Sequence, residues 1–202
     1  MPETHAEPCS SVDFALPART PAAPRCSVLH GGARVRRASR RRAFRRTRRP
    51  GFALRLALGK AESLRSANSD AWILGADQVA VGPGPELLHK PGTEDQAIAQ
   101  LMRLSGATFQ LVTGVVLLDA TSGVSDTAID IQTLTMRAYG EDEAAAYVRR
   151  YQPLDCAGSF RIEDAGIKLF ARIDSADFTG IIGLPLLAVA RLLRTAGLLP
   201  GP

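Results

Sequence analysis

Apolar and polar positions follow a regular period only after residue 50. The segment 52–65, FALRLALGKAESLR, predicts an amphipathic helix because its apolar residues recur at helical spacing. Those residues are Leu54, Ala57, Leu58, Ala61 and Leu64. The segment 71–81, AWILGADQVAV, predicts a buried strand that runs into a polar turn, and the Gly-Pro cluster at 82–85 ends it.

A second helix is predicted by a capping box. Thr93 stands three residues before Gln96, a spacing in which the threonine side chain caps the first turn. The helix should end near Gly106. Its inward-facing residues are expected to be Ile98, Leu101 and Met102.

Two long β-rich segments, 108–119 and 126–138, come next. The turn signal at 120–123, Ala-Thr-Ser-Gly, joins them, so they predict a hairpin. The second segment alternates around Ile129 and Ile131.

The last third of the chain mixes helices and strands. Residues 141–150, EDEAAAYVRR, predict a helix with acids in the first turn and arginines in the last, which complements the helix dipole. Strands are expected near 156–160 and 166–173, before a final helix with Pro185 in its first turn and Gly197 as its end. The apolar stripe of that helix is Leu186, Val189, Ala190 and Leu193. With no internal repeat, the pattern predicts an α/β or α+β sheet domain.

Residues 1–50 show no sustained period and few large apolar side chains, so we expect this quarter to be disordered or poorly packed. It carries twelve arginines against three acids, a balance of +9. Residues 51–202 carry thirteen basic and seventeen acidic side chains, a balance of −4. The basic character of the chain therefore belongs to its first quarter and does not indicate the partners of the rest.

Length and composition predict one domain with a sizeable core, because the chain has 202 residues of which 46% are hydrophobic. It has no run of eighteen apolar residues and no apolar segment behind a basic start, so we expect a cytoplasmic protein without a membrane partner. Cys9, Cys26 and Cys156 are too few and too widely spaced for a disulfide framework or a zinc site. Cys156 is expected to be a small buried hydrophobe.

Three ionisable residues are distinguished by position. Asp77 follows a buried apolar stretch, at the expected carboxyl end of a strand, and is either a site residue or a turn-capping group. Lys90 precedes Pro91, which favours an extended backbone, and Lys60 lies within an apolar helix. Each lysine alone is compatible with a surface position. One carboxylate and two ammonium groups around one pocket would suit a metal ion and a polyphosphate.

Six short motifs together resemble the Maf family of nucleoside triphosphate pyrophosphatases. In chain order they are GKAESL (59–64), GADQV (75–79), HKP (89–91), TG (113–114), DCAGSFRIEDAG (155–166) and GLPL (183–186). The resemblance covers about 150 residues, 51–202. The Asp-Gln pair of GADQV, where another branch has Asp-Thr, and Glu163 resemble the branch that hydrolyses 7-methyl-GTP.

The resemblance implies a Maf/ITPase-like α/β fold, an elongated mixed sheet with flanking helices and a cleft between two lobes. It implies cleavage between the α and β phosphates to the monophosphate and pyrophosphate, a house-cleaning of the nucleotide pool, with a divalent cation, Mg²⁺ or Mn²⁺. The expected partner is a nucleotide substrate, and a homodimer is left open. Nucleic acid is not expected to bind.

The resemblance also implies a role for each candidate residue. Asp77 is expected to be the general base and to help hold the metal. Lys60 and Lys90 are expected to bind phosphates, while Gln78 and Glu163 select the base. A carboxylate at Glu163 would favour 7-methylguanine because methylation at N7 gives the base a positive charge.

The family's Ser-x-Ser-Pro-x-Arg-Arg phosphate loop and a later Asp-Glu pair have no counterpart in residues 1–50. Instead, residues 36–51, RRASRRRAFRRTRRPG, contain nine arginines. A GC-rich coding strand read out of frame would produce such a segment. Two hypotheses remain open: a Maf-type enzyme, impaired by the missing loop, and a catalytically inactive Maf-like protein whose arginine-rich arm binds nucleic acid through phosphate charge.

Overall fold

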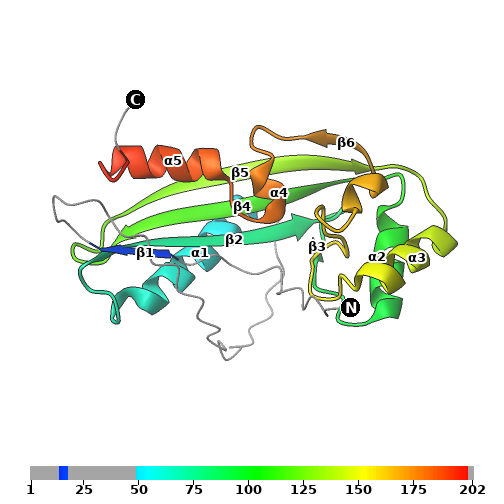
Figure 1. Cartoon of the computed structure of the whole chain (residues 1–202), viewed down its shortest axis with the longest axis horizontal. Coiled ribbons are helices and arrows are strands. Elements are labelled where there is room, and N and C mark those ends of the chain that lie inside the picture. The colour runs from blue at the N-terminus through cyan, green and yellow to red at the C-terminus, as the bar shows by residue number, and fades with distance from the viewer. Residues whose placement is uncertain (1–13, 18–48, 200–202) are drawn as a thin grey trace, which may run out of the picture. The chain divides into compact units, whose positions relative to one another are not determined.

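The computed structural model describes residues 14–17 and 49–199 (Figure 1). The chain mixes helices and strands along its length, which confirms the expected α/β class. In chain order they are β1 (Phe14–Pro17), α1 (Arg49–Arg65), β2 (Ala71–Val81), β3 (Leu87–Leu88), α2 (Glu94–Leu104), β4 (Thr108–Asp119), β5 (Ser125–Met136), α3 (Glu141–Tyr151), the 3₁₀ helix η1 (Gly166–Leu169), β6 (Phe170–Asp174), α4 (Thr179–Ile182) and α5 (Leu186–Thr195).

The strands form one sheet in the order β1-β2-β4-β5-β6, with β3 paired to β2. The pairs β1–β2, β2–β3 and β5–β6 are antiparallel. The predicted hairpin of β4 and β5 is confirmed, since both strands lie where the sequence places them and are neighbours in the sheet. None of the helices in the described residues is long and apolar enough to cross a membrane.

The described chain divides into two compact units. Unit 1 comprises residues 78–113 and 130–186, and unit 2 comprises residues 14–17, 49–77, 114–129 and 187–199. Strands β2, β4 and β5 contribute residues to both units.

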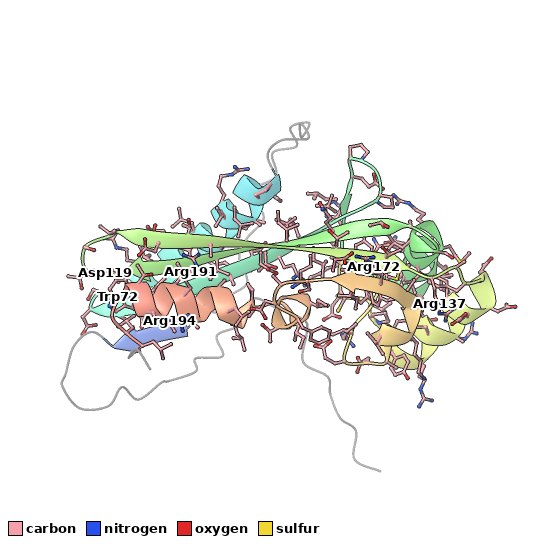
Figure 2. The ribbon with its side chains drawn as sticks, turned by 90° about the horizontal axis from the view of Figure 1, so that it is seen from above. Trp72, Asp119, Arg137, Arg172, Arg191 and Arg194 are labelled. Carbon is pink, nitrogen blue, oxygen red and sulfur yellow. The ribbon has the colours of Figure 1, made fainter. Side chains whose placement is uncertain are left out.

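Small residues bring α1 close to the sheet in unit 2. Ala53, Ala57 and Ala61 recur every four residues and are fully buried. A Cβ on Gly114 of β4 would lie 2.5 Å from the backbone N of Leu54, so only glycine lets the helix approach this closely. Helix α5 lies on the opposite face of the sheet, and its Arg191 and Arg194 are labelled in Figure 2.

The core of unit 1 is larger and more aromatic. It joins α2, α3 and the neighbouring strands through Leu101, Leu134 and Tyr147. Phe160 meets Phe109 edge to face, with ring centroids 5.9 Å apart, and Phe170 at 5.0 Å. The capping function of Thr93 is confirmed, since its side chain accepts a hydrogen bond from Gln96 N at 3.3 Å.

Several expectations about individual positions were wrong. Asp77 does not end a strand, because β2 continues for four residues beyond it and pairs with β3 through Ala80 and Val81. Ile129 and Ile131 do alternate, but on the exposed face of β5. Leu58 and Leu186 are also exposed, and Leu192 is the buried residue of α5 that the predicted stripe omitted.

Residues 156–160 form turns and not the expected strand. Gly158 and Ser159 have φ of +92° and +60°, which a β-strand does not accommodate. Strand β6 begins only at Phe170, because residues 166–169 form η1. Cys156 is buried, as expected.

The arginine-rich first quarter is mostly outside the described residues, including Cys9, Cys26 and the run at 36–48. Two parts of residues 1–50 are described. Phe14–Pro17 forms β1, paired with Ala71–Leu74 of β2, and α1 begins at Arg49. Apart from β1, which hydrogen-bonds at an edge of the sheet, and the start of α1, the expectation of a disordered or poorly packed quarter falls on residues outside the described part of the chain.

Candidate active site

The alternation of β2 directs Asp77 toward α1. Side chains at every second position of a strand share a face. Ile73 packs against α1, and a Cβ on Gly75 would lie 3.0 Å from the Cβ of Ala61. Asp77 is the next residue on this face, where Gly75 leaves space for the helix to come close.

Helix α1 places Lys60 beside this carboxylate. The Lys60 ammonium forms an ion pair with Asp77 Oδ1 and donates to the carbonyl oxygen of Ala76 at 3.2 Å. The Lys60 and Asp77 side chains are 28% and 18% exposed, so both remain partly accessible to solvent. Unit 2 thus presents a proton acceptor and a cation in direct contact, a pair suited to activating water and to binding phosphate.

Gln78 lies on the other face of β2 and belongs to unit 1. Its amide nitrogen donates to Thr113 Oγ1 at 2.9 Å and to the carbonyl oxygen of Gly180 at 2.6 Å. Both hydrogens of the amide are therefore used inside the protein. Gln78 anchors α4 in this structure.

A polar network continues from Gly180 in unit 1. The amide nitrogen of Gln132, which is fully buried, donates to Asp130 Oδ2 at 2.8 Å and to the carbonyl oxygen of Asp177 at 2.7 Å. Asp177 Oδ1 in turn accepts from Thr179 Oγ1 at 2.5 Å. The pKa of Asp130 is raised overall: burial raises it most, the hydrogen bond from Gln132 lowers it, and the charge of Asp177 raises it further.

Sequence reasoning missed this network. Gln132 is fully buried and directly follows the exposed Ile131, so the apolar pattern pointed to the wrong face of β5. The signal that could have revealed it is the placement of polar residues at every second position, Asp130 and Gln132, opposite the isoleucines.

Lys90 and Glu163 lie in unit 1, and both are exposed. Lys90 stands between exposed His89 and buried Pro91. Glu163 extends from the turn at residues 162–165, between buried Ile162 and partly buried Asp164. Of the five predicted site residues, the structure brings Lys60 and Asp77 into contact within unit 2, and it places Gln78, Lys90 and Glu163 in unit 1.

The residues available for a divalent cation are few. Within residues 14–17 and 49–199, no three or more His, Cys, Asp or Glu side chains gather as a metal site. Asp77 can supply one carboxylate, and Mg²⁺ is commonly held by one or two carboxylates together with substrate phosphates and water. A cation held by one carboxylate together with ligands from outside the protein is therefore the arrangement that Asp77 could support.

Comparison with known proteins identifies the family. The family model for Maf-like proteins matches residues 25–196. The chain belongs to the Maf family. The resemblance drawn from the six motifs is thereby confirmed. The match extends over most of the chain and begins before Gly51.

Three Maf relatives give the comparison more detail. The chain is 44% identical over 146 residues to the 7-methyl-GTP pyrophosphatase of Xanthomonas campestris pv. campestris (strain 8004), covering 72% of this chain and 75% of the relative. It is 42% identical over 146 residues to the 7-methyl-GTP pyrophosphatase of Xanthomonas axonopodis pv. citri (strain 306), with the same coverage. It is also 42% identical to that of Cupriavidus pinatubonensis (strain JMP 134 / LMG 1197), covering 72% of each chain.

Proposed function

We propose that this Maf protein is a nucleoside triphosphate pyrophosphatase that hydrolyses 7-methyl-GTP to 7-methyl-GMP and pyrophosphate. The proposal is supported by relatives named for this activity at 42–44% identity. The observation that carries it is the contact between Lys60 and Asp77, which joins a proton acceptor to a phosphate-binding cation. A role in clearing a modified nucleotide from the pool agrees with a cytoplasmic location.

Asp77 serves as the general base. Its carboxylate accepts a proton from a water molecule whose oxygen attacks the α-phosphorus, the bond to the bridging oxygen breaks, and pyrophosphate leaves. Lys60 holds the carboxylate in place through its ion pair and offers its ammonium to a phosphate oxygen as substrate enters. Lys90, exposed at the end of the segment after β3, binds a phosphate as a second point charge.

A divalent cation, Mg²⁺ or Mn²⁺, would be held by Asp77 and the substrate phosphates. When bound, it supplies positive charge that offsets the negative charge of the phosphate oxygens. Removal of divalent cations with EDTA should therefore stop pyrophosphate release, and added Mg²⁺ or Mn²⁺ should restore it.

Gln78 and Glu163 select the base. The Gln78 amide nitrogen is engaged with Thr113 and Gly180, so its oxygen is the atom available to a ligand. The Glu163 carboxylate is exposed, and it would attract the positive charge that N7-methylation gives to guanine. A Glu163→Gln protein should retain hydrolysis and lose its preference for 7-methyl-GTP over GTP.

The decisive experiment measures pyrophosphate release from a panel of nucleoside triphosphates by the full chain. Asp77→Asn should lower kcat for 7-methyl-GTP by about 100-fold or more, the usual contribution of a general base. Asp126→Asn, an exposed aspartate of β5 in the same unit, is the matched control. Wild-type activity in Asp77→Asn would contradict the assigned base.

The same panel tests the hypothesis of an enzyme impaired by an arginine-rich segment in place of the family's phosphate loop. A salt titration of the full chain on duplex DNA addresses the nucleic-acid hypothesis. Binding through that segment would weaken steeply with salt and show little preference for sequence.

A further inference from the structure

The loop that carries Glu163 is held in an unusual backbone conformation. Among the described residues, the three non-glycine residues with positive φ are Gln152 (47°), Ser159 (60°) and Ala165 (58°). All three lie in the segment 152–165 between α3 and η1, and Glu163 is in the same segment. Such conformations cost free energy and persist only where surrounding contacts impose them.

The middle of this segment is fixed by α2. The Gln100 side-chain oxygen accepts a hydrogen bond from the backbone N of Gly158 at 2.8 Å and from Ser159 Oγ at 2.7 Å. Ser159 is fully buried, so its left-handed conformation is held from inside the unit.

The end of the segment is fixed through Arg161. Its guanidinium, which is only 14% exposed, bonds to three oxygens around the turn. Nη2 donates to Asp155 Oδ1 at 2.5 Å, and Nη1 donates to Asp164 Oδ2 at 3.1 Å and to the carbonyl oxygen of Tyr151 at 3.2 Å. Asp155 precedes Phe160–Glu163 in the chain and Asp164 follows it. The Arg161 side chain therefore links the two ends of the turn through these aspartates.

Tyr147 of α3 fixes the backbone of Arg161. Its hydroxyl donates to the carbonyl oxygen of Arg161 at 3.2 Å and accepts from the backbone N of Arg161 at 3.1 Å. Burial raises the pKa of Tyr147 to about 12, so the hydroxyl keeps its proton at neutral pH. Gly166 completes the contact by donating its N–H to the Arg161 carbonyl at 3.0 Å.

Neither Arg161 nor Tyr147 is expected to touch the base, because Arg161 is occupied by acids and a carbonyl and Tyr147 is buried. Glu163, two residues beyond Arg161, is the exposed charge of the turn. A carboxylate held in place before binding gains more from a cationic ligand than one that must first be ordered.

We propose that Arg161 and Tyr147 are positioning residues for base selection, fixing the turn so that the Glu163 carboxylate favours a cationic purine over a neutral one. This inference rests on the proposed function. It predicts that loosening the turn lowers the preference for a methylated base while Glu163 itself is intact.

The test compares the dissociation constants of GMP and 7-methyl-GMP by isothermal titration calorimetry, a readout that does not require catalysis. The variants are Arg161→Lys, which cannot bond to both acids in the fork geometry of arginine, and Tyr147→Phe, which removes only the hydroxyl. Arg172→Lys is the matched control. Arg172, labelled in Figure 2, extends from β6 in the same unit, is 72% exposed and pairs with Asp174.

Each positioning variant should reduce the wild-type preference for 7-methyl-GMP by about fivefold to tenfold, the size expected for one charge interaction at an exposed site. Glu163→Gln should reduce it as far, and the double variant Arg161→Lys/Glu163→Gln should reduce it no further. Arg172→Lys should retain the wild-type ratio.

Unchanged ratios in both Arg161→Lys and Tyr147→Phe would overturn the inference, and so would a wild type without preference. A role confined to stability would lower Tm and weaken both ligands equally. If Arg161→Lys does not fold, Tyr147→Phe alone decides the outcome. The proposed function is judged separately by pyrophosphate release, so a chain that prefers 7-methyl-GMP without hydrolysing any triphosphate would contradict the activity and retain the positioning role.

Discussion

Replacing Gly114 with alanine should push α1 away from the sheet. A Cβ at this position would lie 2.5 Å from the backbone N of Leu54 and 2.6 Å and 2.8 Å from the carbonyl carbon and oxygen of Ala53. Ordinary contacts between heavy atoms are about 3.5–4.0 Å, so the helix must move by about 1 Å. All three neighbours are backbone atoms, which a rotamer change does not displace.

The expected cost is at the upper end of the range for overpacked cores, about 3 kcal/mol. For a domain of this size, that corresponds to a fall in Tm of about 6–12 °C. Thermal and urea unfolding followed by far-ultraviolet circular dichroism would measure both quantities. Because α1 also carries Lys60, the same displacement should separate Lys60 from Asp77 and lower kcat/KM.

Gly59→Ala is the matched control on the same helix. It is an exposed helical glycine with no atom within 4 Å of an added Cβ. Alanine is the better helix former, so this variant should gain about 0.5–1 kcal/mol. A Gly114→Ala protein as stable as the wild type, or a Gly59→Ala protein that is less stable, would refute the packing argument.

Two further predictions concern unit 1. Gly180→Ala should lower the free energy of unfolding, because the added Cβ meets Gln132 Nε2 and Asp130 Oδ2. Gly140→Ala is the control in the same unfolding assay, because an added Cβ there has open space. Equal stabilities of the two variants would contradict the prediction. Burial raises the pKa of Asp155, but the hydrogen bond and charge of Arg161 outweigh burial, so the pKa is lowered overall. The ion pair therefore stabilises the folded state above the usual aspartate pKa of about 3.9, and this stabilisation is lost as pH falls through the lowered pKa. The stability difference between wild type and Asp155→Asn should therefore be greatest near neutral pH and shrink in acid, and urea titrations showing a constant difference would count against the ion pair.

The sequence predicted most of the fold because its helices and strands have clear periods. The hairpin, the helix capped by Thr93 and the α3 segment all lie within a few residues of their predicted bounds. The strand expected at 156–160 failed because the backbone N of Gly158 donates to the Gln100 side chain, a contact across 58 residues that a local pattern does not reveal. Ile129 and Ile131 show the same limit, since alternation identifies two faces but not which one is covered.

The candidate site was predicted in part. Lys60 and Asp77, seventeen residues apart, were expected around one pocket, and they form an ion pair. The link between Gln78 and Gly180 spans 102 residues and could not be foreseen from the spacing of motifs. Base selection by Gln78 and Glu163 and phosphate binding by Lys90 stay predictions.

The position of Asp77 and Gln78 within β2 has a consequence for how the family could diversify. Adjacent residues of a strand face opposite sides, so the aspartate belongs to the contact with α1 and the glutamine to the contact with α4. A mutation at Gln78 can remodel the surroundings of Gly180 without changing the partner of Asp77. Under the roles proposed above, two neighbouring codons can thus evolve under separate pressures, one for the reaction and one for the choice of nucleotide.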